Sequence, residues 1–252
     1  MKFSVRMAID QFMLDKYRQK LKLYLCKRWN VPYNRYGIPN PLFDNVREGQ
    51  PITLIDIGAH NGSFSASLSQ YCSIKRGILI EPLEDKYKLL LDRFRPPVYE
   101  VLNCVVSDRM GHVEFEINEL SETSSILSIK KDIPEHANLA ISVKDRMQCE
   151  SKTLDSIVKE YELGSIDVLK IDVQGAELLV LHGASGTLAK TRMIWLEVSF
   201  KPLYDNSATF FDIYSFMARA KFMFIGMAPV FYSPSGELIQ CDALFIHDDK
   251  IA

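Results

Sequence analysis

Cysteine is scarce in this chain of 252 residues: there are five, and they lie far apart, at positions 26, 72, 104, 149 and 241. The absence of a Cys-x-x-Cys pair and of a cysteine–histidine cluster excludes the common zinc-binding patterns. The thiols are therefore expected to be reduced, as in a cytoplasmic protein. No apolar run reaches the ~18–20 residues of a transmembrane segment. The first 20 residues lack the apolar core and the cleavage site of a signal peptide.

Glycine and proline are too few for a fibrous protein, with 12 and 11 residues, and we find no repeat or low-complexity tract. Hydrophobic residues make up 47% of the chain and charged residues 25%, a balance that is typical of a globular protein and excludes a disordered one. The length allows one large domain or two small ones.

Positive charge is concentrated at one end of the chain. Residues 1–36 contain nine Lys or Arg and two Asp, a balance of +7, whereas the remainder carries a balance of −9. Because the remainder offers no broad cationic surface for phosphates, we expect no nucleic-acid partner.

The basic end also has the pattern of an amphipathic helix. Apolar residues recur every three or four positions between about residues 8 and 28, with basic residues between them. We expect residues 1–50 to form an accessory helix and a connector rich in Pro, Asn and Gly, with the helix packed on the main domain. Peripheral contact of the basic face with an anionic membrane or an acidic partner remains the alternative.

From residue 51 onward, short apolar runs alternate with helical patterns, which predicts an α/β domain over residues 51–252 with a mostly parallel sheet. The apolar runs ITLIDIG, GILIEP, YEVLNCVVSD, DVLKIDV and MIWLEVSF read as core strands. The last two strands have no helix between them, which indicates an antiparallel strand at one edge. Residues 118–151 are polar and irregular, and we interpret them as a substrate lid.

Four predicted strands end in or contain an acid: Asp56, Glu81, Asp172 and Glu197. The carboxyl ends of parallel strands lie at one edge of the sheet, where ligands bind in such folds. An acidic edge favours a ligand with an ammonium or sulfonium charge and repels a pyrophosphate. Two structural alternatives remain: an internal ion pair of Lys170 with Asp172, and stabilisation of Glu81 by a helix dipole.

A glycine-containing loop, Gly58-Ala59-His60-Asn61-Gly62, follows the first strand. Its spacing is GxxxG and not the GxGxxG of dinucleotide-binding proteins. Its amides are expected to face a ligand at the start of the next helix. Glu81 follows Gly62 by 19 residues, and its carboxylate can accept two hydrogen bonds from a ribose diol. Ser107-Asp108, after the third strand, either bonds an adenine amino group or caps a turn.

These motifs occur together in an order that resembles a known family. The segments LIDIGAHNGSFS, ILIEP, VVSDRMGHVEFEI, SSIL, KTLDSI, LKIDVQGAELLVLHGA and IWLEVS, between residues 52 and about 247, are similar to those of the FkbM-like S-adenosylmethionine-dependent methyltransferases. The chain departs from the family pattern at Gln174, where an acid is commoner, and at His60, where a small residue or Asn is usual.

The resemblance implies a Rossmann-like methyltransferase sheet of seven strands in the order 3-2-1-4-5-7-6, with helices on both faces, and S-adenosylmethionine as cofactor. It also implies the binding residues. The loop with Asp56, Gly58, Ala59, His60, Asn61 and Gly62 would surround the methionine half, Glu81 would hold the ribose, Ser107 and Asp108 would lie beside the adenine, and Asp172 would lie near the amino group and the methyl.

We therefore expect an O-methyltransferase that acts on a hydroxyl of a small-molecule or saccharide acceptor. Asp172 and Glu197 are the candidate general bases, with Lys170 and His182 less favoured. No metal is expected, because no Asp-Asn pair follows the strand. One alternative is a non-catalytic cofactor-binding or scaffold protein of the same fold. A nicotinamide-dependent oxidoreductase is disfavoured by the missing GxGxxG and by Asp56. The sequence defines neither the acceptor nor the oligomeric state.

Overall fold

The computed structural model describes residues 40–46, 49–130, 142–233 and 235–250. The accessory helix expected between residues 8 and 28 lies outside these ranges. Among the described helices, none is long and apolar enough to cross a membrane. The four cysteines within the described ranges (Cys72, Cys104, Cys149 and Cys241) are buried and free.

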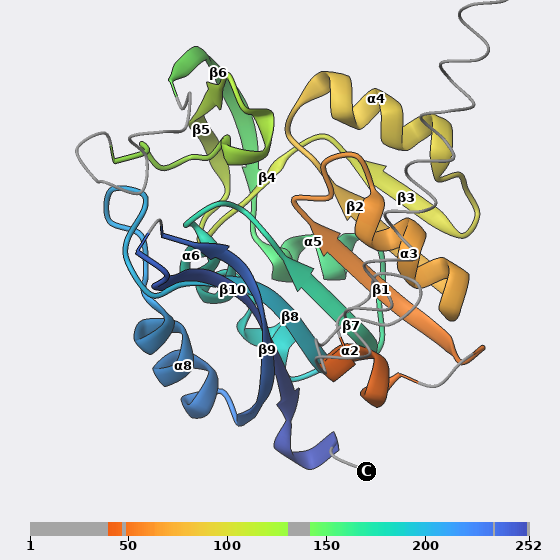
Figure 1. The fold of residues 1–252 in the computed structure, drawn as a ribbon. Coiled ribbons are helices and arrows are strands. Elements are labelled where there is room, and N and C mark those ends of the chain that lie inside the picture. The colour runs from red at the N-terminus through yellow and green to blue at the C-terminus, as the bar shows by residue number, and fades with distance from the viewer. Residues whose placement is uncertain (1–39, 47–48, 131–141, 234, 251–252) are drawn as a thin grey trace, which may run out of the picture.

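A central sheet of seven strands organises the described part of the chain (Figure 1). Its strands are β1 (Pro51–Ile57), β2 (Ser73–Ile80), β3 (Tyr99–Leu102), β7 (Ile166–Ile171), β8 (Thr191–Ser199), β9 (Phe222–Tyr232) and β10 (Leu238–His247). Their order in space is β3-β2-β1-β7-β8-β10-β9. β10 is antiparallel to both β8 and β9, and the remaining pairs are parallel. The expected α/β fold with a mostly parallel sheet is thus confirmed.

The strand labels of the central sheet do not run from 1 to 7, because three strands of the chain belong to a second sheet. β4 (Val105–Val106), β5 (Gly111–Asn118) and β6 (Val143–Lys152) form a three-stranded sheet in the order β4-β6-β5. When only the seven strands of the central sheet are numbered, their order is 3-2-1-4-5-7-6. The second sheet was not predicted.

Two expectations are corrected by this second sheet. The strand expected over residues 99–108 is divided, because β3 pairs with β2 whereas β4 pairs with β6. Part of the expected irregular lid, residues 118–151, is the regular strand β6. Its sequence VKDRMQCESK carries five charged residues and most of its side chains are exposed or half-buried, so it lacks the apolar alternation that would have revealed it.

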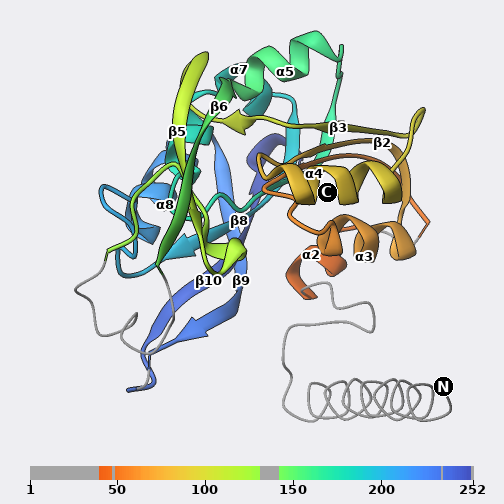
Figure 2. The ribbon, with the colours of Figure 1, turned by 90° about the horizontal axis from the view of Figure 1, so that it is seen from above.

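Helices cover both faces of the central sheet (Figure 2). One face packs against α5 (Leu154–Glu160), α6 (Glu177–His182), α7 (Ser185–Leu188) and α8 (Phe210–Arg219). The other packs against α2 (Asn40–Asn45), α3 (Ser63–Tyr71) and α4 (Glu84–Arg93). Adjacent residues of one strand enter opposite layers, as Val168 and Leu169 of β7 do. Strands buried on both faces explain the nearly continuous apolar runs in the sequence.

A half-buried carboxylate fixes the short helix α7 to α5. The Asp155 side chain accepts hydrogen bonds from the backbone N–H of Gly186 (2.9 Å) and of Thr187 (2.7 Å) and from the Thr187 hydroxyl (2.7 Å). Burial alone would raise the pKa of Asp155, but these hydrogen bonds outweigh it and hold the pKa below its usual value. The bonds therefore stabilise the charged form of the folded protein.

We expect Asp155→Ala to lower the free energy of unfolding by about 1.5–3 kcal/mol at neutral pH, because the charge-assisted hydrogen bonds are lost. A carboxylate with a depressed pKa contributes stability above its unfolded pKa of about 3.9, and this stability is lost as the pH falls through the folded pKa. The difference in Tm between wild type and variant should shrink below about pH 4. Thermal denaturation across pH tests this, with exposed Asp92→Ala as control. A difference that does not depend on pH would contradict the charged-cap interpretation.

Candidate functional site

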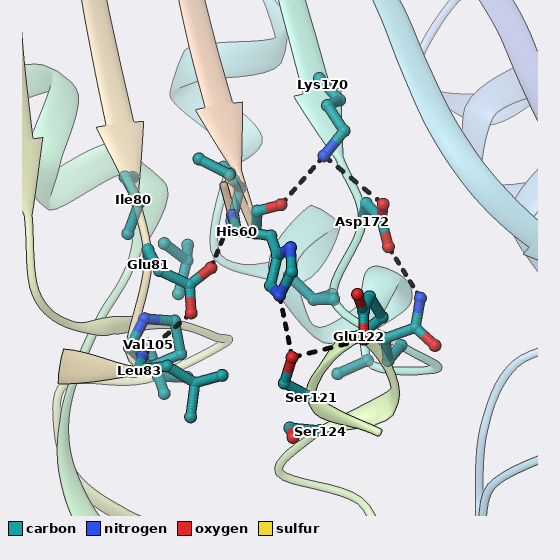
Figure 3. A pocket seen from close by; sticks show the side chains of 18 of the residues that line it. His60, Ile80, Glu81, Leu83, Val105, Ser121, Glu122, Ser124, Lys170 and Asp172 are labelled. Carbon is teal, nitrogen blue, oxygen red and sulfur yellow. Dashed lines mark hydrogen bonds and ion pairs between the residues drawn. The ribbon is translucent and has the colours of Figure 1, made fainter. Parts of the chain in front are cut away.

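A cavity of about 380 Å³ lies at the carboxyl ends of the central strands. One side of the cavity is formed by β8 and by the loops that follow β1, β2 and β7. The other side is formed by the second sheet and the short 3₁₀ helix η1 (Ser121–Thr123). Figure 3 shows His60, Glu81, Lys170 and Asp172 around this space, with Ser121 opposite them. Side chains far apart in sequence thus meet at one edge of the sheet, as the strand-end acids predicted.

Gly58 begins the first wall, directly after β1. Its φ is +71°, and a Cβ at this position would lie 1.8 Å from the backbone oxygen of Asp172. The amides of Gly58 and Ala59 both donate to the carbonyl of Ile80 at 3.0 Å. Only glycine permits this close approach, so the residue brings the ends of β1, β2 and β7 together.

His60 connects this loop to η1 across the cavity. Its φ is +48°, and its backbone N–H donates to Glu81 Oε2 at 2.8 Å. Its ring Nε2 lies 3.0 Å from the hydroxyl oxygen of Ser121. Burial lowers the pKa of His60, so the ring is neutral at pH 7. The contact with Ser121 is therefore a hydrogen bond between neutral groups.

Glu81 is 4% exposed and lies in the cavity wall at the end of β2. Its two carboxylate oxygens accept from different backbone amides, those of His60 (2.8 Å) and of Leu83 (2.9 Å). Burial raises the pKa of Glu81 to about 7, although these hydrogen bonds oppose the change. The two amides fix the orientation of the carboxylate, and each oxygen keeps a lone pair for a ligand.

Lys170 is the cation of the site. Its Nζ lies 3.2 Å from Asp56 Oδ1 and 3.5 Å from Asp172 Oδ2, and donates to the Gly58 carbonyl at 3.0 Å. Burial alone would lower the pKa of Lys170, but the two carboxylates raise it above its usual value, so the ammonium stays charged. Asp56 is fully buried, accepts a hydrogen bond from Ser65 at 2.6 Å and is not part of the cavity wall. Its expected contact with a ligand is therefore replaced by an internal ion pair.

Asp172 and Glu197, the two candidate bases, line the same cavity. The side-chain amide of Gln174 lies between them and donates to Asp172 Oδ1 (2.8 Å) and to Glu197 Oε2 (2.9 Å). Gln240 also donates to Glu197 Oε2, at 3.0 Å. Burial, together with the charges of Asp172 and nearby acids, raises the pKa of Glu197 well above its usual value. Burial thus favours the uncharged form of Glu197, whereas Asp172 lies beside the ammonium of Lys170.

Besides Asp56, three expected ligand contacts lie outside the cavity wall: Gly62, Ser107 and Asp108. Gly62 precedes α3 and packs against the side chains of Leu90 and Phe94. The Ser107 carbonyl lies so close to Gly183 that a Cβ on that glycine would come within 2.2 Å of it. The Ser107 hydroxyl donates to the Asp108 carboxylate at 3.1 Å. Ser107 and Asp108 lie away from the expected position because the third strand is divided between β3 and β4, which belong to different sheets.

An apolar wall stands where Ser107 and Asp108 were expected. It is formed by Leu83, Cys104, Val105, Val106 and Phe115. Phe115 lies on β5 of the second sheet. It could not be assigned to the site from the sequence, because the second sheet was not predicted. Burial raises the pKa of the Cys104 thiol to about 12.

Two further features bear on the expected chemistry. The His182 ring packs edge-on against Phe216 with centroids 5.1 Å apart and does not line the cavity, which removes it as a candidate base. Within the described ranges, no group of three or more His, Cys, Asp or Glu side chains is arranged to hold a metal ion.

The cavity joins an acidic wall to an apolar one, which suits a cationic ligand with a flat apolar part.

Comparison with known proteins gives one family. The methyltransferase FkbM domain matches residues 56–224. The chain is 34% identical over 123 residues to the 2-O-methyltransferase NoeI of Sinorhizobium fredii, covering 46% of this chain and 48% of that protein. It is 32% identical over 199 residues to the AMB antimetabolite synthetase AmbE of Pseudomonas aeruginosa, covering 67% of this chain and 9% of that protein. The chain thus spans about half of the first relative and about a tenth of the second.

Among solved structures, the chain is similar to a methyltransferase FkbM from Methylobacillus flagellatus, with 15% identity and a TM-score of 0.48, covering 78% of this chain and 44% of that one. It is also similar to TrmK of M. capricolum in complex with S-adenosylhomocysteine. That match has 8% identity and a TM-score of 0.44, and it covers 80% of this chain and 64% of the other.

We expect Gly58→Ala to destabilise the protein, because the left-handed backbone alone costs a residue with a Cβ about 1–2 kcal/mol. The clash with the Asp172 carbonyl adds to this cost. In a domain of this size Tm falls by about 2–4 °C for each kcal/mol. Gly164→Ala is the matched control, since its Cβ would meet open space. Equal Tm values for the two variants in thermal denaturation would show that the loop can move away from Asp172.

Proposed function

Since the chain belongs to the methyltransferase FkbM family, we propose that it transfers a methyl group from S-adenosylmethionine to a hydroxyl of a small-molecule or saccharide acceptor. The observation that carries this proposal is the single cavity in which Glu81, Asp172 and Glu197 meet at the carboxyl ends of the strands. We assign this activity to residues 51–252, and residues 1–50 to an accessory segment.

The cavity fits this cofactor by its chemistry. Carboxylates near a cleft of low dielectric constant favour a ligand that carries sulfonium and ammonium charges. In our proposal Glu81 accepts hydrogen bonds from the ribose hydroxyls, the apolar wall with Val105 and Phe115 holds the adenine, and Asp172 faces the amino group. Gly58, Ala59, His60 and Asn61 line the cavity, so in our proposal the loop lies against the methionine half of the cofactor.

When bound, S-adenosylmethionine supplies a methyl group whose bond to sulfur breaks, leaving its electron pair on sulfur, as a bond to the acceptor oxygen forms. The chain must orient the acceptor, which can contribute ~7–11 kcal/mol, and must take the hydroxyl proton. We assign the proton to the Asp172 carboxylate. The ammonium of Lys170 lies 3.5 Å from this carboxylate. Glu197 is joined to Asp172 through the side-chain amide of Gln174.

The acceptor side supports a hydroxylated substrate. Ser121, Glu122, Ser124 and His60 give this part of the cavity a polar lining. The relative from Sinorhizobium fredii is named a 2-O-methyltransferase, which is also transfer to an oxygen. The expectations of a cytoplasmic location and of no nucleic-acid partner stay predictions.

Glu81→Gln should weaken S-adenosylmethionine binding by about 10- to 100-fold, because charge-assisted hydrogen bonds are worth about 1.5–3 kcal/mol each. Titration calorimetry measures the change in Kd. Glu84→Gln is the matched control, since Glu84 lies exposed in the first turn of α4 only three residues away. An unchanged Kd for Glu81→Gln would remove the ribose assignment, and binding of NAD but not of S-adenosylmethionine by the wild type would favour an oxidoreductase.

Asp172→Asn should lower kcat by about 100- to 10,000-fold, the range that a general base contributes, with little change in Tm. Turnover is measured as S-adenosylhomocysteine release with a panel of monosaccharides and methyl glycosides as acceptors. Asp85→Asn, at a side chain 73% exposed, should keep the wild-type rate. Full activity of Asp172→Asn would place the base elsewhere. Cofactor binding by the wild type without turnover on any acceptor would favour the non-catalytic alternative.

A further inference from the structure

Gln174 adopts an uncommon backbone conformation at the centre of the site. Its φ is +57°, and the next residue, Gly175, has a φ of +95°. A residue with a Cβ adopts this region only where surrounding contacts hold it there, and such residues cluster at functional sites. Gln174 also lines the cavity, and the contacts of its side chain explain why the backbone is held in this conformation.

The amide of Gln174 has a partner for each of its polar atoms. Its nitrogen donates one hydrogen to Asp172 Oδ1 (2.8 Å) and the other to Glu197 Oε2 (2.9 Å). Its oxygen accepts from the hydroxyl of Tyr204 at 3.0 Å. A flipped amide would place its oxygen against two carboxyl groups, so this network allows a single orientation.

The same hydroxyl connects the amide to the opposite wall. Tyr204 is 2% exposed, and its hydroxyl lies 2.9 Å from the carbonyl oxygen of Thr123 in η1. Two residues that flank this carbonyl region, Ser121 and Ser124, line the acceptor side of the cavity. The single hydroxyl hydrogen is shared between this carbonyl and Gln174 Oε1, which couples the position of η1 to the orientation of the Gln174 amide.

The acids around this amide show what a neutral donor contributes in this chain. Asp172 faces Lys170 and His60, and it also repels Glu177, Glu197 and Asp242. Burial, followed by the charge of Asp172, raises the pKa of Glu177 and of Asp242 to about 7. A third carboxylate at position 174 would add to this repulsion, whereas an amide bonds both acids and adds no charge.

We propose that Gln174 is a positioning residue, which holds the Asp172 carboxylate directed into the cavity by sharing its amide between Asp172 and Glu197. Tyr204 fixes the amide and thereby links this carboxylate to η1. The inference rests on the proposed function, in which Asp172 faces the cationic cofactor and then takes the acceptor proton.

The test compares binding of S-adenosylmethionine with binding of S-adenosylhomocysteine, which lacks the sulfonium charge, and it needs no acceptor. Gln174→Met keeps the length of the side chain but removes its hydrogen bonds to Asp172 and Glu197. Calorimetry at pH 7 should show S-adenosylmethionine binding weakened by about tenfold, the equivalent of about one hydrogen bond, and S-adenosylhomocysteine binding weakened by less.

Two further variants make the result specific. Tyr204→Phe removes one hydroxyl and should change the two affinities in the same way by a smaller amount. Gln70→Met makes the same chemical change at an exposed position of α3 and should leave both affinities at their wild-type values. Thermal denaturation of each variant at pH 7 gives the change in stability separately from the change in binding.

The outcomes separate this inference from the proposed function. If Gln174→Met and Tyr204→Phe lower Tm but weaken the two ligands equally or not at all, Gln174 is structural and the inference is overturned, while the proposed function stands. If Gln174→Met does not fold, Tyr204→Phe decides between the two. If the wild type does not bind S-adenosylmethionine, the proposed function fails, and this inference fails with it.

Discussion

The geometry of the site depends on the contacts that the Lys170 ammonium makes with three segments of the chain. The ammonium neutralises Asp56 at the end of β1, bonds the carbonyl of Gly58 in the following loop and lies beside Asp172 after β7. Burying an unpaired charge costs several kcal/mol, so none of these three segments can move away without leaving a charge or a polar group unmatched. The ring of Phe64 at the start of α3 lies 5.9 Å from the same ammonium. One cation thus fixes the geometry of the acidic wall.

The remaining walls depend on that fixed centre. His60 and Glu81 are joined by a backbone hydrogen bond, and His60 carries the connection to η1. On the opposite side, Leu83 packs with Val105, Phe115 and other residues of the second sheet. The polar walls are therefore held by hydrogen bonds, whereas the flat apolar wall is held by packing between the two sheets.

Much of this architecture was readable from the sequence. Strands buried on both faces produce long apolar runs, so a charged residue such as Glu81 or Glu197 is conspicuous there, and the shared edge of a parallel sheet brings these acids together. The pairing of Asp56 with Lys170 was less accessible. The two residues are register partners on β1 and β7, and only the order of strands in space makes them neighbours. The strand β6 is mostly exposed, so its sequence has no apolar pattern that would predict a strand. The position of Gln174 depends on a left-handed backbone conformation, which could not be predicted from the residue type.

Cys104 gives the apolar wall a further property. In the proposed function the cavity holds a methyl donor, for which a thiol in the wall is a rival nucleophile whose reactive form is the thiolate. With a pKa of about 12, only ~1 in 100,000 Cys104 side chains is ionised at pH 7. The sulfur therefore acts in the wall as a small apolar group, and in the proposed function the burial that suits an adenine ring would also protect the protein from alkylating itself.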